Sequence, residues 1–186
     1  MIIGSIFHYF FGFNTLEFLI IVLCSFAVDF DILFVNFSEE NNHRMFISHS
    51  VIPSIILLII GLILNWNFLI ICGLAYLSHI FIDTLDWGTN IFYFQKKIIG
   101  FKFLISKEEF ENLDKYLVKY KVPRSFFDFK YYRSKLFLTL EAIFFLLMMF
   151  CIIYLAFEFI FTIILYFIGL VFHTYTHFRL KSIETH

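Results

Sequence analysis

The apolar stretch from Leu136 to Thr174 constrains the fold more than any other feature of the sequence. Glu141 and Glu158 are its only acidic residues, and it contains no lysine or arginine. As one helix the stretch would be about 58 Å long at 1.5 Å per residue. The hydrocarbon core of a bilayer is only about 30 Å thick. The stretch therefore predicts two membrane spans that turn near Glu158.

The composition extends this prediction to the rest of the chain, because 61% of its 186 residues are hydrophobic and only 16% are charged. An ordinary soluble domain has about 45–50% and 25%, so the bilayer is the expected solvent. We predict an all-α, multi-pass integral membrane helical bundle of about five spans. It forms a single membrane domain over residues 1–186. The predicted spans cover residues 16–34, 51–64, 68–82, 136–156 and 159–176.

Basic residues indicate the orientation of these spans. Segment 84–135, predicted to be a cytoplasmic loop or subdomain, holds 11 of the 14 Lys and Arg residues. The positive-inside rule places that side in the cytoplasm, so the expected location is the cell (inner or plasma) membrane. The net charge of −1 gives no field that would recruit nucleic acid. The expected partner is membrane lipid, and the oligomeric state stays open.

Carboxylates end the first predicted span. Asp29 and Asp31 lie where a charged side chain costs about 2.5–3.5 kcal/mol unless it is compensated. A divalent cation would compensate the charge, because carboxylate oxygens are hard ligands. Positions i and i+2 of a helix point about 200° apart, so one carboxylate binds metal while the other orients a neighbour, or the helix ends between them. Without metal, both would snorkel into the interface.

Imidazoles and further carboxylates lie at the ends of two other segments. His79 and Asp83 share a helix face at i,i+4 spacing, although such a pair alone is as well explained by a structural hydrogen bond. The conjunction of three His and four Asp in a charge-poor chain predicts a metal centre. Mixed His and Asp ligation without Cys favours Zn, with Mn or Fe as alternatives. The candidate residues are Asp29, Asp31, His43, Arg44, His49, His79, Asp83 and Asp86.

The expected activity is that of an enzyme, a metal-dependent hydrolase in which a metal-bound water loses its proton more easily and attacks the substrate. Asp86 or Asp31 is the candidate base. Arg44 is expected to stabilise developing negative charge, or else to be a positive-inside anchor. The expected ligands of the first metal are Asp29, His43, His79 and Asp83, with His49 as a further metal candidate.

Two other classes of protein stay open. A His-ligated di-iron membrane oxidoreductase needs several closely spaced His boxes, and only His173 and His177 have that spacing. This pair could also join the cluster, complete a second metal site, or simply favour a helix C-terminus. A non-catalytic metal-binding or transport membrane protein is the second alternative. A transporter would place its polar residues near the bilayer midplane, whereas these lie at segment ends.

The three motifs also resemble those of a known family. VDFD, HRMFISHS and AYLSHIFIDTLD are similar, over residues 16–90, to the PDxD, HRxxTHS and GYxSHxxxD pattern of the membrane-bound metal-dependent hydrolases. Val28 and Ser48 stand where that pattern has proline and threonine. His8 matches a histidine that members often carry early in the chain, and the resemblance makes it a further metal candidate. By resemblance the motif residues are Asp29, Asp31, His43, Arg44, His49, His79 and Asp83.

A fainter similarity reaches the zinc-dependent phospholipase C and P1-nuclease-like enzymes. They also separate an Asp and a His by thirteen residues and then carry H-x3-D, as Asp29 with His43 and His79 with Asp83 do here. This similarity implies phosphoester hydrolysis by analogy. The hypothesis is therefore a membrane-embedded hydrolase that acts on a phosphoester of a lipid or of another membrane-proximal substrate.

Overall fold

The structure, a computed structural model, describes residues 1–37, 43–95 and 97–185, without the side chains at positions 32, 33, 35, 36 and 43. These residues are helical, apart from irregular connections and one antiparallel bridge between Thr89 and Ile99. The α-helices are α1 (Ile2–Phe11), α2 (Thr15–Cys24), α3 (Ile52–Ile63), α4 (Asn67–Asp86), α5 (Lys107–Glu111), α6 (Leu113–Leu117), α7 (Pro123–Arg133), α8 (Lys135–Leu155) and α9 (Ile163–Thr185). The 3-10 helices are η1 (Ala27–Phe37), η3 (His43–Met45), η4 (Ile47–His49) and η5 (Phe157–Thr162).

Three of the described helices are long and apolar enough to cross a membrane, which indicates a membrane location. They are α4, α8 and the continuous segment Phe157–Thr185, formed by η5 and α9. The predicted turn near Glu158 is present as η5, and the predicted span 68–82 lengthens to a helix of 20 residues. The helices α1, α2 and α3 are apolar but shorter.

The prediction that residues 16–34 form a single long helix is wrong, because α2 ends at Cys24. An α-helix, α2, does begin near the start of this segment, and Asn14 and Glu17 form a capping box at its start. The α-helix stops at Cys24, where the Ser25 hydroxyl donates to the Val22 carbonyl at 2.6 Å. Serine competes for helix carbonyls in this way, and the chain continues as the 3-10 helix η1. The break directs the carboxylates of η1 toward α4.

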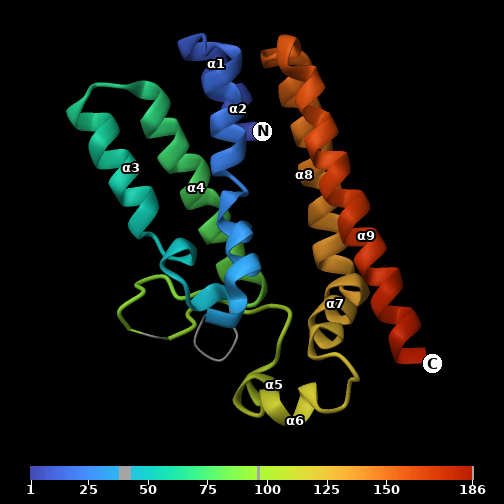
Figure 1. Cartoon of the computed structure of the whole chain (residues 1–186). Coiled ribbons are helices and arrows are strands. Elements are labelled where there is room, and N and C mark those ends of the chain that lie inside the picture. The colour runs from blue at the N-terminus through green and yellow to red at the C-terminus, as the bar shows by residue number, and fades with distance from the viewer. Residues whose placement is uncertain (38–42, 96, 186) are drawn as a thin grey trace.

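Figure 1 shows the helices in two groups, with α1–α4 on one side and the antiparallel pair α8 and α9 on the other. The α3–α4 hairpin is tightly packed because glycines lie at its contact. A Cβ at Gly61 would lie 2.8 Å from the Ile70 nitrogen, and one at Gly73 would lie 3.0 Å from the Ser54 carbonyl. Small residues allow such close approach of membrane helices.

Helix α2 packs against α4 in its own group and also against η5, which joins α8 to α9. Its Ile21 contacts Ile71 of α4, whereas its Phe18 packs against Phe159 of η5 with ring centroids 4.1 Å apart. The residues at these two contacts, Ile21, Ile71, Phe18 and Phe159, are all apolar and buried. These apolar contacts therefore fix the position of the end of α2 along α4, and with it the position of the start of η1.

The loop after α4 folds back on the helix and satisfies its last carbonyls, which have no partner within the helix. The Phe101 nitrogen donates to the Thr84 carbonyl at 2.7 Å, and the Phe103 nitrogen donates to the Leu85 carbonyl at 2.8 Å. Gly100 has φ 150°, and a Cβ there would collide with the Thr84 carbonyl. The loop thus fixes the C-terminal turn of α4, which carries candidate ligands.

The basic segment contains short helices. Ser106 forms a capping box with Glu109 at the start of α5. Asn112 separates α5 from α6. Lys130 of α7 lies 2.5 Å from Glu109 and connects α7 to α5.

Candidate metal centre

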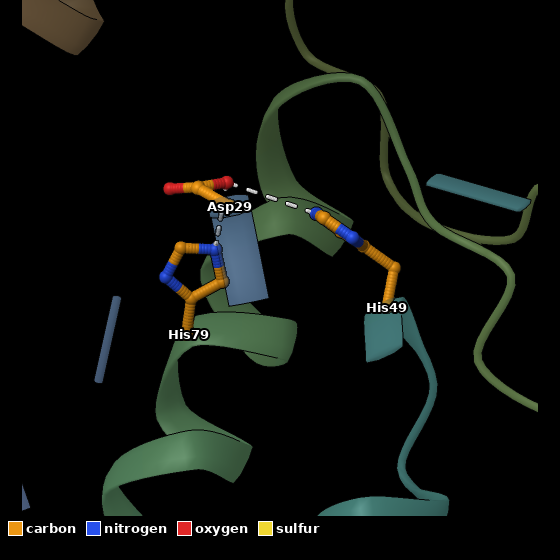
Figure 2. A group of neighbouring side chains, drawn as sticks. All are labelled: Asp29, His49 and His79. Atoms are coloured by element: carbon orange, nitrogen blue, oxygen red, sulfur yellow. Dashed lines mark ion pairs between the residues drawn. The ribbon is translucent and has the colours of Figure 1, made fainter. Parts of the chain in front are cut away.

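Three side chains from three elements point toward one another near the C-terminal end of α4 (Figure 2). Asp29 comes from η1, His49 from η4 and His79 from α4. One ligand atom of each lies within 4.8 Å of the ligand atoms of the other two, so this group could hold a metal ion. Asp83, one turn after His79 on the same face of α4, contacts both imidazoles.

The distances among these four residues are those of metal ligands rather than hydrogen bonds. Asp29 Oδ1 lies 3.7 Å from His49 Nε2 and 3.4 Å from His79 Nε2. Asp83 Oδ2 lies 3.4 Å and 3.5 Å from the same two nitrogens. In a tetrahedral zinc site with ligands at about 2.0–2.1 Å, neighbouring ligand atoms are about 3.3–3.4 Å apart. The four nitrogen–oxygen distances are therefore compatible with the two imidazoles and the two carboxylates around one metal ion.

The orientation of the His79 ring supports a cation at this point. Its Nδ1 lies 2.8 Å from the Ser25 carbonyl, which can only accept, so Nδ1 carries the proton. A neutral ring then presents the Nε2 lone pair to two carboxylate oxygens. Nε2 of His79 and Oδ2 of Asp83 are buried without a hydrogen-bond partner among the described residues. Burying such groups unpaired is costly, and a cation between them, or a second ring proton, removes the cost.

His49 is held by a second carboxylate. Asp31 Oδ2 lies 2.6 Å from His49 Nδ1 and also accepts the hydroxyl proton of Ser48. Burial lowers the pKa of His49, but the carboxylates of Asp29 and Asp31 outweigh it, so the pKa is raised. Asp29 and Asp31 thus reach opposite nitrogens of one ring. A metal-ligating His typically has its other nitrogen bound to a carboxylate or carbonyl, as here.

Arg44 holds Asp83 and Asp86 in place. Its Nη1 and Nη2 donate to Asp86 Oδ1 and Oδ2 at 2.8 and 3.0 Å, and Nη2 lies 3.3 Å from Asp83 Oδ1. A further bond to the Gly88 carbonyl measures 2.9 Å. Burial lowers the pKa of Arg44, but the carboxylates of Asp83 and Asp86 raise it by more, so the net pKa lies above its usual value. Asp83 therefore has one oxygen on the guanidinium and the other directed at the imidazoles.

The candidate metal centre is buried on one side and open on the other. The His49 side chain is 0% exposed and that of Asp83 is 8% exposed, whereas that of Asp29 is 58% exposed. Catalytic zinc sites combine protein ligands with a position open to water or substrate. Asp29 marks the side from which either would approach this centre.

One predicted metal candidate, His8, does not join this group in the described structure. It lies 2.7 Å from Glu158 at η5 and packs edge-on against Phe159. The backbone of His43 belongs to η3, but its side chain lies outside the described part of the chain, so its predicted role as a ligand stays a prediction.

The other His pair faces α7. His177 Nδ1 lies 2.6 Å from Asp128 Oδ2, and the Tyr132 hydroxyl lies 3.1 Å from His173 Nδ1. The Tyr132 ring also packs on His177, with centroids 3.9 Å apart. The pair thus connects α9 to α7.

Several residues that support the site carry no sequence signal for that role. Ser25 acts through its backbone carbonyl, which every residue type has. Thr89 donates its hydroxyl to the His49 carbonyl at 2.8 Å, and Tyr76 donates to the Ser48 carbonyl at 2.5 Å. Their positions follow from tertiary contacts between the loop after α4, α4 itself and η4.

Comparisons of the chain with protein-family models, with curated proteins and with solved structures found no significant match. The resemblance to the membrane-bound metal-dependent hydrolases therefore stays a prediction from three short motifs. Functional inference starts instead from the geometry of Asp29, His49, His79 and Asp83.

Proposed function

We propose that this protein is a membrane-embedded, metal-dependent hydrolase that acts on a phosphoester of a lipid or of another membrane-proximal substrate. One observation carries the proposal: four ligand atoms converge, with cross distances of 3.4–3.7 Å, around a point that is open at Asp29. A bound divalent cation, Zn first and Mn or Fe as alternatives, would supply Lewis acidity and lower the pKa of a bound water.

In this proposal the surrounding residues position the ligands. Asp31, one of the two bases expected from the sequence, orients His49. Asp86, the other, binds the guanidinium of Arg44 through both oxygens. The sequence suggested that Arg44 stabilises developing negative charge on the substrate. We instead assign Arg44 the role of holding Asp83 in place. Asp29 is the exposed carboxylate of the group, so water or substrate would approach the metal on its side.

A non-catalytic metal site is the second candidate. It is favoured by the burial of His49 and Asp83, because a cation held there would join η1, η4 and α4 without needing a substrate. A di-iron oxidoreductase gains less from the structure, since His173 and His177 bind Tyr132 and Asp128. The phosphoester class is supported by the spacing similarity to zinc-dependent phospholipase C and P1-nuclease-like enzymes.

Metal analysis followed by a substrate panel separates these candidates. The purified protein in detergent should contain a divalent metal and hydrolyse a member of a panel of phosphate mono- and diesters, including phosphatidic acid. Chelation should abolish turnover and zinc should restore it. His79→Ala should lose metal and turnover, whereas His173→Ala, an exposed histidine on α9, should retain both. Metal without turnover on any substrate would favour the non-catalytic site, and absence of metal would contradict both.

We also propose that α2 and α3 complete a multi-pass arrangement of about five membrane segments, with the metal centre facing the cytoplasm. The proposal is supported by the basic segment 84–135, which folds back on the end of α4 that carries the ligands. A cysteine in place of Lys119 should react with an impermeant maleimide only after the cells are opened. Labelling of intact cells would reverse the orientation.

A further inference from the structure

An apolar cavity of about 420 Å³ lies between the two groups of helices shown in Figure 1. Val22 of α2 and Leu85 of α4 line one wall, and Leu140 and Phe144 of α8 line the opposite wall. Ligand pockets in proteins typically measure about 300–1,000 Å³. The cavity is therefore large enough to hold a ligand, and it is not a mere packing defect between helices.

The cavity is continuous with the outer, apolar surface of the helices. Ile82 and Phe144, which line it, are each 46% exposed, and only 22% of the apolar window of α8 is buried within the protein. In a membrane this outer surface contacts lipid chains. Water fills a cavity only where polar partners are available, and an empty cavity would forfeit dispersion contacts. Hydrocarbon is the occupant that fits both conditions.

Polar groups are found toward one end of the cavity. Asp86 ends α4, Tyr131 belongs to α7, and Glu141 lies in the second turn of α8. The Tyr131 hydroxyl donates to Glu141 Oε2 at 2.7 Å. Met148, which lines the apolar part, is about 10 Å farther along α8. Ionisable residues within candidate spans are functional candidates by default, and this distribution matches a molecule with a polar head and an apolar chain.

The polar end of the cavity adjoins the candidate metal centre. The cavity wall includes Ser25, whose carbonyl accepts the proton of His79 Nδ1. It also includes Phe26, whose carbonyl accepts from the Asp29 nitrogen at 3.2 Å. The short connection from α2 to η1 therefore borders the cavity and supports the metal centre at the same time.

We propose that this cavity binds one hydrocarbon chain of a membrane lipid, with the lipid head group at the polar end beside Glu141 and the metal centre. Chain binding is independent of catalysis, but the role of that lipid as the substrate rests on the proposed function. A seated chain would hold the head group near the centre and lower the entropic cost of reaction. The substrate class is then a lipid amphiphile instead of a soluble phosphoester.

Photo-crosslinking tests the proposal directly. The probe is a phosphatidic acid with a diazirine midway along one acyl chain, added to the full chain in phosphatidylcholine nanodiscs, and adducts are mapped by mass spectrometry. Adducts should concentrate on cavity-lining residues such as Leu140 and Phe144. Leu140→Trp fills the cavity and should reduce this labelling several-fold. Leu146→Trp makes the same change on the outer face of α8, where Leu146 is 66% exposed, and should leave it unchanged.

Leu140→Phe adds less volume and replaces the tryptophan variant if that variant does not fold. Adducts confined to outward positions such as Leu146, or equal labelling of the wild type and Leu140→Trp, would overturn the proposal. Cavity labelling that persists in metal-free His79→Ala supports chain binding independently of the metal. Cavity labelling without turnover on any phosphoester would refute the proposed function alone, whereas turnover of soluble phosphoesters without cavity labelling would refute the lipid chain alone.

Discussion

The candidate metal centre and the α7–α9 contact start from the same sequence pattern and differ in outcome. His79 and Asp83 on α4, and His173 and His177 on α9, are both i,i+4 pairs on candidate membrane-spanning helices. The pair on α4 meets two other segments, η1 and η4, and contacts a carboxylate or an imidazole from each. The pair on α9 meets α7, which supplies one partner per imidazole.

The difference lies in what faces each imidazole. His79 Nε2 is directed at the oxygens of Asp29 and Asp83, a group of acceptors that requires a cation or a proton. His177 makes a 2.6 Å contact with Asp128, a length that an ordinary hydrogen bond explains. Helical spacing therefore identifies a metal pair only where several segments bring lone pairs to one point.

Loss of metal is the largest effect expected from this comparison. His79→Ala removes a nitrogen ligand, so metal affinity should fall by more than about 100-fold, the upper end of what indirect ligand partners contribute. A chelator should lower the melting temperature of the wild type, because metal at 100–1,000 times its Kd stabilises the folded state by about 2.7–4 kcal/mol. That response should vanish in His79→Ala. Metal content and chelator-dependent unfolding in detergent measure both effects.

The control is His177→Gln, which retains a hydrogen-bonding side chain next to Asp128. It should keep stoichiometric metal and the full chelator response. If His79→Ala still binds metal at wild-type affinity, the ligands lie elsewhere, and the two histidines of α9 become the first alternative.

A smaller effect is expected where the carboxylate acts through the imidazole. Asp31→Asn retains an acceptor for His49 Nδ1 but removes the charge that makes the ring a better ligand, so metal affinity should fall by about 10–100-fold. Competition with a fluorescent zinc chelator measures this change. Asp128→Asn makes the same substitution beside His177 and should leave metal affinity unchanged. Equal losses in the two variants would refute the distinction between the two His pairs.

The smallest effect concerns the ion pair that connects α7 to α5. Partial burial raises the pKa of Glu109, but the hydrogen bonds from Lys130 and Ser106 outweigh it and lower the pKa below its usual value of 4.5. A carboxyl with a lowered pKa in the folded state stabilises the fold above pH 4.5, and that stabilisation is lost as the pH falls through the folded-state value. An ion pair of this kind contributes about 0.2–1 kcal/mol.

Glu109→Gln should therefore lower the free energy of unfolding by that small amount at neutral pH and flatten its dependence on pH in the acid range. Denaturant titrations in detergent at pH values on both sides of 4.5 provide the measurement. The matched control is Glu111→Gln, because Glu111 lies 3.9 Å from Lys107 with both side chains largely exposed. A similar flattening in the control would show that the Lys130 contact is not the cause.

Hydropathy predicted the long helices well and the first span poorly. Residues 136–174 had to divide into two helices because one helix would exceed the bilayer thickness, and the turn at η5 follows from that length. The segment 16–34 is also largely apolar, yet its α-helix ends before Ser25. Hydropathy averaged over a segment does not detect one hydroxyl that bonds back to a helix carbonyl. It also does not detect the packing of η1 against α4.

The sequence by itself determined the helical membrane class, the positions of the long spans, and the set of carboxylates and imidazoles from which the candidate centre is drawn. Apolar length, helix capping and i,i+4 spacing are local properties, so they can be derived from the order of residues. Only the tertiary structure decided that His49 stands beside His79, that Asp31 orients a ring, and that Arg44 holds Asp83. These relations join residues 18 to 39 positions apart, and packing of η1, η4 and the loop after α4 against one helix end sets their distances.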